Sequence, residues 1–163
     1  MDALLLATKA HHGQVRRNTQ EPYIMHPIRV SKTLYEQTGD LRLTVAGLCH
    51  DLLEDTKITH EELVIATSSD IAELVLSVTK KPNLSKDECE REFLSRYRNS
   101  QLDTVLLKLA DRADNVRDLK FQNQTFRDRY RENTSMLLAA TPSFNYHPVV
   151  AKLVAIIKAN IYS

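Results

Sequence analysis

Apolar residues recur at helical spacing along almost the whole of this 163-residue chain. Spacings of three and four residues gather such side chains on one face of a helix. Only three glycines and five prolines interrupt the sequence, and no segment alternates apolar and polar residues as a half-buried strand would. The length is sufficient for one domain with its own hydrophobic core. We therefore expect an all-α fold in which residues 1–163 form a single domain.

Local start and stop signals predict where the helices begin and end. Thr59 and Ser85 each begin a capping box, with a glutamate three residues later. In this motif a hydroxyl and a carboxylate satisfy the first backbone amides of a helix. Pro27 fits a helix start and Gly39 a helix stop. Together with the apolar spacing, these signals predict helices after both capping boxes, between Pro27 and Gly39, near 71–78, and over 2–12, 41–53, 102–117, 126–140 and 147–161.

Composition narrows the class of protein. The formal net charge of +1 argues against a polymeric nucleic acid as partner, because proteins that follow phosphate backbones are usually basic. Cys49 and Cys89 are too few for a disulfide framework and form no zinc-binding Cys-x-x-Cys pair, and we expect Cys49 to be a core residue. The first residues include an acid where a signal peptide carries a base. No run approaches the roughly 18 apolar residues of a membrane span. These features predict a cytoplasmic protein with no membrane partner.

One segment concentrates ionisable side chains within apolar surroundings. His50 and Glu54 are four residues apart, as are Asp51 and Asp55. On a continuous helix, this spacing places all four groups along one wall. Burying a carboxylate without a partner is very costly, so the cluster needs a cation or a hydrogen-bond network. The segment therefore suggests a metallohydrolase rather than a binding module.

Two other apolar segments supply a histidine and an aspartate that complete a ligand set. His26 alone is typical of a capping residue, and Asp111 beside an arginine is typical of an ion pair. With His50 and Asp51 they give two imidazoles and two carboxylates, whose formal charge of −2 suits Mn²⁺, Fe²⁺ or Zn²⁺. Water on such an ion has a lowered pKa and attacks phosphorus readily. The neighbouring acidic pair, Glu54-Asp55, would then orient and deprotonate that water.

This order of residues resembles the H…HD…D ligand pattern of the HD-domain phosphohydrolases. The chain is most similar to the hydrolase domain of RelA/SpoT alarmone enzymes and to the single-domain small alarmone hydrolases of the metazoan SpoT type. The resemblance extends from residue 3 to about residue 120 and is carried by residues 10–17, 21–27, 50–56, 78–80 and 108–115. It implies a compact HD-domain helical bundle with its active site between helices.

The resemblance also implies a role for individual residues. One divalent ion, normally Mn²⁺ in this branch, would be bound by His26, His50, Asp51 and Asp111. Glu54 and Asp55 would be the catalytic carboxylates that position and activate water.

The implied substrate contacts are mostly basic. Arg16 and Arg17 would lie against the nucleotide, one of them stacking on the base, since a planar guanidinium can stack and also bind phosphate. Asn115 would contact the sugar or the 3′ phosphate group. The outer phosphates would be contacted by Lys80 and Lys81, and the sugar by Tyr130.

The implied activity is hydrolysis of the 3′-pyrophosphate of the alarmone (p)ppGpp to GDP or GTP and pyrophosphate. The segment 17–21 departs from the pattern, because it lacks the usual glycine and is one residue longer than in the long RelA/SpoT enzymes. The same chemistry on (p)ppApp, or on the 2′-phosphate of NADPH, is therefore an alternative. A non-catalytic nucleotide-binding regulator is an alternative of another class. We expect a small-molecule nucleotide as partner and a stand-alone hydrolase without synthetase or regulatory domains; the oligomeric state is left open.

Overall fold

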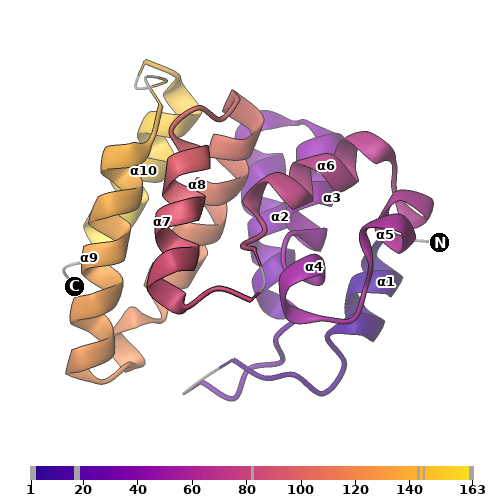
Figure 1. Ribbon diagram of the computed structural model, residues 1–163, viewed down its shortest axis with the longest axis horizontal. Helices are drawn as coiled ribbons and strands as arrows, with labels where there is room; N and C mark the ends of the chain where they lie inside the picture. Colours follow the sequence, from indigo (N-terminus) through magenta and orange to yellow (C-terminus); the bar gives the residue numbers. More distant parts are fainter. Residues whose placement is uncertain (1–2, 17–18, 82, 143, 145, 162–163) are drawn as a thin grey trace. The chain divides into compact units, whose positions relative to one another are not determined.

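The computed structural model describes residues 3–16, 19–81, 83–142, 144 and 146–161 (Figure 1). Within these ranges the regular structure is helical, and the only β-type pairing is an isolated antiparallel bridge between Val15 and Pro22. The expected all-α fold is confirmed. Contacts divide the chain into two compact units, Met1–Lys80 and Lys81–Ser163.

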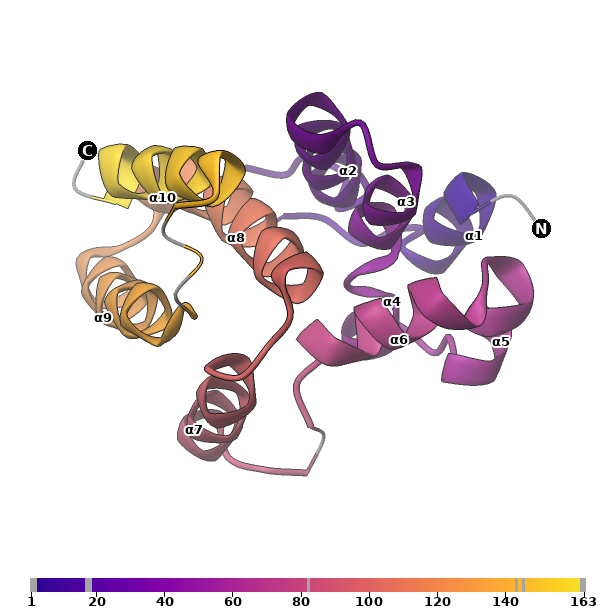
Figure 2. The ribbon, with the colours of Figure 1, turned by 90° about the horizontal axis from the view of Figure 1, so that it is seen from above.

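The first unit is built around α3, which contacts α1, α2 and α6. Helices α2 and α3 run side by side in both views (Figures 1 and 2). Their connection is short because Gly39 adopts a left-handed φ of 66° and ends α2, while the Asp40 side chain accepts from the first amides of α3. The helices of this unit are α1 (Ala3–Ala10), α2 (Met25–Thr38), α3 (Leu41–Cys49), α4 (Leu52–Asp55), α5 (His60–Ala66) and α6 (Ser69–Val78).

A glycine permits the close approach of α2 and α3. A Cβ atom at Gly47 would lie 2.7 Å from Leu34 Cδ1 and 3.1 Å from Ser31 Cα. The Ser31 hydroxyl donates a hydrogen bond to the Thr44 carbonyl oxygen at 2.8 Å across the same contact. This tight packing holds the start of α2 beside the end of α3, which is where the candidate ligands lie.

The second unit is centred on α8, which is buried along most of its length. Helix α8 packs against α10, and α7 packs against α9. Figure 2 shows α8 and α10 side by side. The helices of this unit are α7 (Lys86–Tyr97), α8 (Leu102–Arg117), the short 3₁₀ helix η1 (Leu119–Phe121), α9 (Gln124–Ala140) and α10 (Pro148–Ile161).

The predicted boundaries agree with the structure to within about two residues except at one functional position. Both capping boxes are present, at Thr59 and Ser85. The single helix expected over residues 41–53 is wrong, because α3 ends at Cys49 and α4 begins only at Leu52. The His-Asp pair therefore occupies a junction between two helices rather than the wall of one helix. None of the helices in the described ranges has the length and apolar character that crossing a membrane requires.

Candidate metal centre

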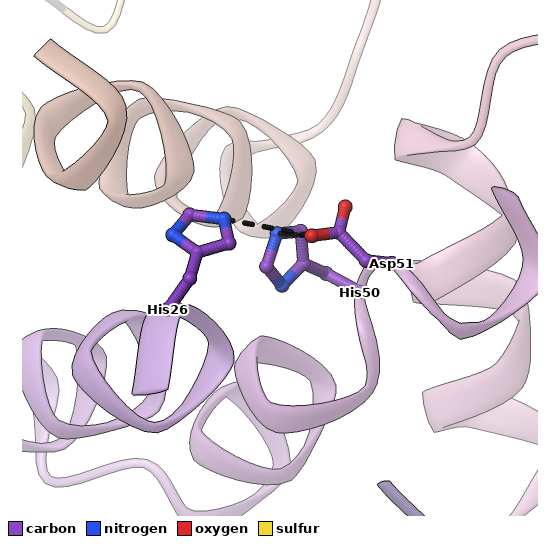
Figure 3. Close-up of side chains that lie close together, drawn as sticks. All are labelled: His26, His50 and Asp51. Carbon is purple, nitrogen blue, oxygen red and sulfur yellow. Dashed lines mark ion pairs between the residues drawn. The ribbon is translucent and has the colours of Figure 1, made fainter. Parts of the chain in front are cut away.

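Three of the four predicted metal ligands come together in the first unit. His26 lies in the first turn of α2, and His50 and Asp51 form the junction between α3 and α4. Both imidazoles point toward the Asp51 carboxylate (Figure 3). Asp51 Oδ2 is 3.1 Å from His50 Nε2 and 3.5 Å from His26 Nε2. One ligand atom from each residue lies within 4.8 Å of the others, and both histidines are buried.

These separations suit a single divalent ion. Two ligand atoms that are each about 2.1 Å from one ion lie roughly 3.0–3.4 Å apart at octahedral to tetrahedral angles. The two distances to Asp51 Oδ2 fall at or close to that range. Imidazole nitrogen and carboxylate oxygen form a donor set that suits Mn²⁺, Fe²⁺ and Zn²⁺. His26, His50 and Asp51 could therefore hold a divalent metal.

A tyrosine connects this cluster to the neighbouring acidic pair. The Tyr23 hydroxyl lies 2.7 Å from Asp51 Oδ2 and 3.0 Å from Asp55 Oδ2, as a donor to the two carboxylates. Burial and the two nearby negative charges raise the pKa of Tyr23, which keeps the phenol protonated. Desolvation and the Asp51 charge raise the pKa of Asp55, against the lowering effects of the Tyr23 hydrogen bond, His11 and His50.

The other predicted catalytic carboxylate is held differently. Glu54 Oε2 accepts a hydrogen bond from the backbone N–H of Lys80 at 3.1 Å. This bond joins α4 to Lys80, the second residue after the end of α6, within the first unit. It orients the Glu54 carboxylate through the main chain of Lys80, and the expected contact of the Lys80 side chain with phosphate stays a prediction.

Arg16, one of the two arginines predicted to lie against the nucleotide, lies in the connection between α1 and α2. The Arg16 guanidinium is 6.0 Å from the centroid of the Tyr23 ring, which places it next to the cluster. Arg17 lies outside the described residues. The connection is anchored by Arg29, whose Nη1 contacts both carboxylate oxygens of Glu21 at 2.7 and 2.8 Å. Arg29 thus ties Glu21 of this connection to α2.

The fourth predicted ligand, Asp111, belongs to the second unit. Its Oδ2 accepts from Lys108 Nζ at 2.8 Å, and its Oδ1 accepts from Asn115 Nδ2. Asn115 follows Asp111 by one helical turn on α8, so the amide orients the carboxylate. Metal-ligating carboxylates characteristically have such a hydrogen-bonded partner. The complete set of four ligands stays a prediction.

The two remaining substrate-contacting candidates also belong to the second unit. Lys81 pairs with Glu92, with Nζ 2.8 Å from Oε1. The Arg112 guanidinium carbon is 4.6 Å from the centroid of the Tyr130 ring, and Phe126 stacks with that ring at 5.7 Å. These contacts fix the Tyr130 ring within its own unit, and its role toward a sugar stays a prediction.

The sequence alone assigned no role to Tyr23 or to His11. His11 is buried, and its ring centroid lies 4.9 Å from that of Tyr23. The available signal was position, because Tyr23 precedes the predicted ligand His26 by three residues, just before a helix. Cys49 is a core residue as expected, and burial raises the pKa of its thiol to about 12, so it is no nucleophile at neutral pH.

Comparison with known proteins decides the family. A family model described as the HD domain matches residues 3–140. The chain belongs to the HD-domain family. An HD domain implies a divalent metal ion, which fits the donor set of His26, His50 and Asp51. The predicted resemblance is confirmed.

Curated relatives of this HD domain carry related names. A protein of Aquifex aeolicus named guanosine-3′,5′-bis(diphosphate) 3′-pyrophosphohydrolase is 37% identical over 137 residues, which cover 80% of this chain and 19% of the relative. The bifunctional (p)ppGpp synthase/hydrolase SpoT of Escherichia coli K12 is 37% identical over 123 residues, covering 72% of this chain and 17% of SpoT. The HD domain thus spans about a fifth of the length of these relatives.

Two solved structures match this chain over most of their own length as well as most of its length. A metazoan ortholog of SpoT that hydrolyses ppGpp has a TM-score of 0.84 and 29% identity, and the match covers 96% of this chain and 92% of that one. A protein from Listeria monocytogenes, at 24% identity and a TM-score of 0.69, shares the fold.

Proposed function

We propose that this HD domain is a Mn²⁺-dependent 3′-pyrophosphohydrolase of (p)ppGpp, and that residues 1–163 act as one functional domain. The observation that carries the proposal is the convergence of His26, His50 and Asp51, with ligand atoms within 4.8 Å of one another. Further support comes from the relatives, which are named for this reaction, and from the metazoan SpoT ortholog, which matches over nearly its whole length.

The metal would be held by His26, His50, Asp51 and Asp111. A divalent ion, when bound, polarises the 3′ phosphoryl group and lowers the pKa of water. His50 is prepared for this task because its Nδ1 is 2.8 Å from the Gly47 carbonyl oxygen and must donate to it. The proton therefore sits on Nδ1, and Nε2 keeps a lone pair on the side that faces Asp51.

Two carboxylates would handle the proton of the attacking water. Asp55 is the group joined to Asp51 through Tyr23, and its raised pKa makes it a stronger proton acceptor than an ordinary aspartate. Glu54 is fixed by the Lys80 N–H and would orient the water. Attack at the 3′ phosphorus breaks the bond to the ribose oxygen, so that ppGpp and water give GDP and pyrophosphate.

Basic and amide side chains would bind the polyanionic substrate. Arg16 and Arg17 would lie against the nucleotide, one of them stacking on the base, and Lys80 and Lys81 would contact the outer phosphates. Asn115 would contact the sugar or the 3′ phosphate group, and Tyr130 would contact the sugar. Fixed positive groups of this kind stabilise the charge that develops during phosphoryl transfer.

A substrate panel tests the proposal. Mn²⁺-loaded protein is incubated separately with ppGpp, ppApp and NADPH, and the products are resolved by anion exchange, with a chelator-treated sample as control. GDP and pyrophosphate, formed fastest from ppGpp and abolished by chelator, is the expected result. Faster turnover of ppApp, or faster release of phosphate from NADPH, would show that ppGpp is not the preferred substrate. Tight binding of ppGpp without any product would support a non-catalytic regulator instead.

A further inference from the structure

The Tyr23 hydroxyl occupies an unusual position between two carboxylates. Its oxygen is 2.7 Å from Asp51 Oδ2 and 3.0 Å from Asp55 Oδ2. A phenol carries one proton, which both carboxylates compete for. Two nearby carboxylates repel each other, so without a shared donor the more solvent-exposed Asp55 side chain would turn away from Asp51. The hydroxyl counteracts that separation.

The ring that carries this hydroxyl is fixed from several directions. His11 lies against it at a centroid distance of 4.9 Å, and the His26 ring forms a T-shaped contact with it at a centroid distance of 5.9 Å. The Tyr23 backbone N–H donates to the Gln14 carbonyl oxygen at 2.9 Å. These contacts leave the hydroxyl little freedom to move away from the carboxylates.

Asp55 is held a second time by the same segment of chain. Gln14 Nε2 donates to the Asp55 carbonyl oxygen at 3.0 Å, and Gln14 Oε1 accepts from His11 Nδ1 at 2.8 Å. The connection between α1 and α2 thus forms hydrogen bonds with both the main chain and the side chain of Asp55. A bond to the main chain fixes where the residue sits, and the Tyr23 bond fixes where its carboxylate points.

We propose that Tyr23 is a positioning residue, which holds the Asp55 carboxylate in register with the metal ligand Asp51. This inference rests on the proposed function, since it assigns Asp55 as a proton acceptor. Loss of the hydroxyl frees the Asp55 carboxylate, so turnover falls while the substrate contacts remain. It also removes a hydrogen bond from a ligand carboxylate, and such partners are typically worth about 10–100-fold in metal affinity or activity.

The test compares Tyr23→Phe, which removes a single oxygen, with Tyr35→Phe on the exposed surface of α2 as the matched control. Thermal unfolding checks that both variants fold. Mn²⁺ affinity is measured by titration of the metal-free protein, and kcat and KM for ppGpp are measured at saturating Mn²⁺. We expect Tyr23→Phe to lose about 10–100-fold in Mn²⁺ affinity and about 10-fold or more in kcat, with KM changed less than about threefold. Tyr35→Phe should match the wild type.

A double variant separates positioning from general damage. If Tyr23 acts through Asp55, Tyr23→Phe/Asp55→Asn should be no slower than Asp55→Asn alone. The inference would be overturned if the kcat losses of the two single variants multiply in the double variant. It would also be overturned by a Tyr23→Phe protein with wild-type kcat and Mn²⁺ affinity. If the wild type leaves ppGpp intact, the proposed function fails, and the metal titration alone decides whether Tyr23 supports Asp51.

Discussion

His50 donates a hydrogen bond from Nδ1 to the carbonyl oxygen of Gly47, over 2.8 Å. Because a carbonyl can only accept, this bond fixes the tautomer of the imidazole and leaves Nε2 to face Asp51. The same glycine has no space for a Cβ atom beside Leu34. One residue therefore sets both the packing of α2 on α3 and the orientation of a candidate metal ligand.

Replacing this glycine should damage stability and metal binding together. Gly47→Ala places a methyl group 2.7 Å from Leu34 Cδ1 and near the Ser31 backbone, and such overpacking typically costs about 1–3 kcal/mol. Urea unfolding and Mn²⁺ titration measure the two effects. Gly39→Ala is the control. An alanine at its positive φ of 66° is strained and costs stability, but its Cβ atom would meet no neighbouring atom within 4 Å. Wild-type metal affinity in a destabilised Gly47→Ala protein would break the link drawn here.

Metal binding and orientation of the attacking water should separate at Glu54. Glu54→Gln keeps the side-chain shape and an acceptor for the Lys80 N–H but removes the charge, so we expect unchanged Mn²⁺ affinity and a loss of about 100-fold or more in kcat. Glu61→Gln, on exposed surface in the first turn of α5, serves as the control. A Glu54→Gln enzyme with an unchanged rate would remove Glu54 from the mechanism.

Stability should depend on pH through Asp55. A carboxyl with a pKa higher in the folded than in the unfolded chain binds its proton more tightly when folded. Folding stability therefore falls as pH rises from the ordinary value of 3.8 through the raised pKa. In chelator-treated protein, Asp55→Asn should have a higher urea midpoint than the wild type at pH 7, and the difference should shrink toward pH 4. A variant less stable than the wild type at pH 7 would contradict this sign.

The segment 17–21, which lacks the usual glycine, contains a residue with a strained backbone. Gln20 adopts a positive φ of 58°, a conformation that costs most residues about 1–2 kcal/mol. Gln20→Gly should raise the free energy of unfolding by about 0.5–1 kcal/mol, because the greater flexibility of glycine offsets part of the relief. Asn83→Gly provides the comparison, with a φ of 69° at a residue type that tolerates it, and should gain less. Equal gains at both positions would argue against strain at Gln20.

Local signals explain why so much of the fold was predictable. The capping boxes at Thr59 and Ser85 depend on residues three apart, and both formed as expected. The break at His50-Asp51 was not predicted because neither residue is a helix breaker. Both keep backbone angles in the right-handed helical region, so the break needs no glycine or proline. The part played by Tyr23 depends on a contact across 28 residues with Asp51, which periodicity along the chain cannot report.

The most direct test measures metal content and ppGpp turnover in one pair of preparations, the wild type and Asp51→Ala, each purified in Mn²⁺. The wild type should contain about one ion per chain and release one pyrophosphate per ppGpp consumed, while Asp51→Ala should have neither metal nor activity. An Asp51→Ala protein that hydrolyses ppGpp at the wild-type rate without metal, or a metal-loaded wild type that leaves ppGpp intact, would contradict the account.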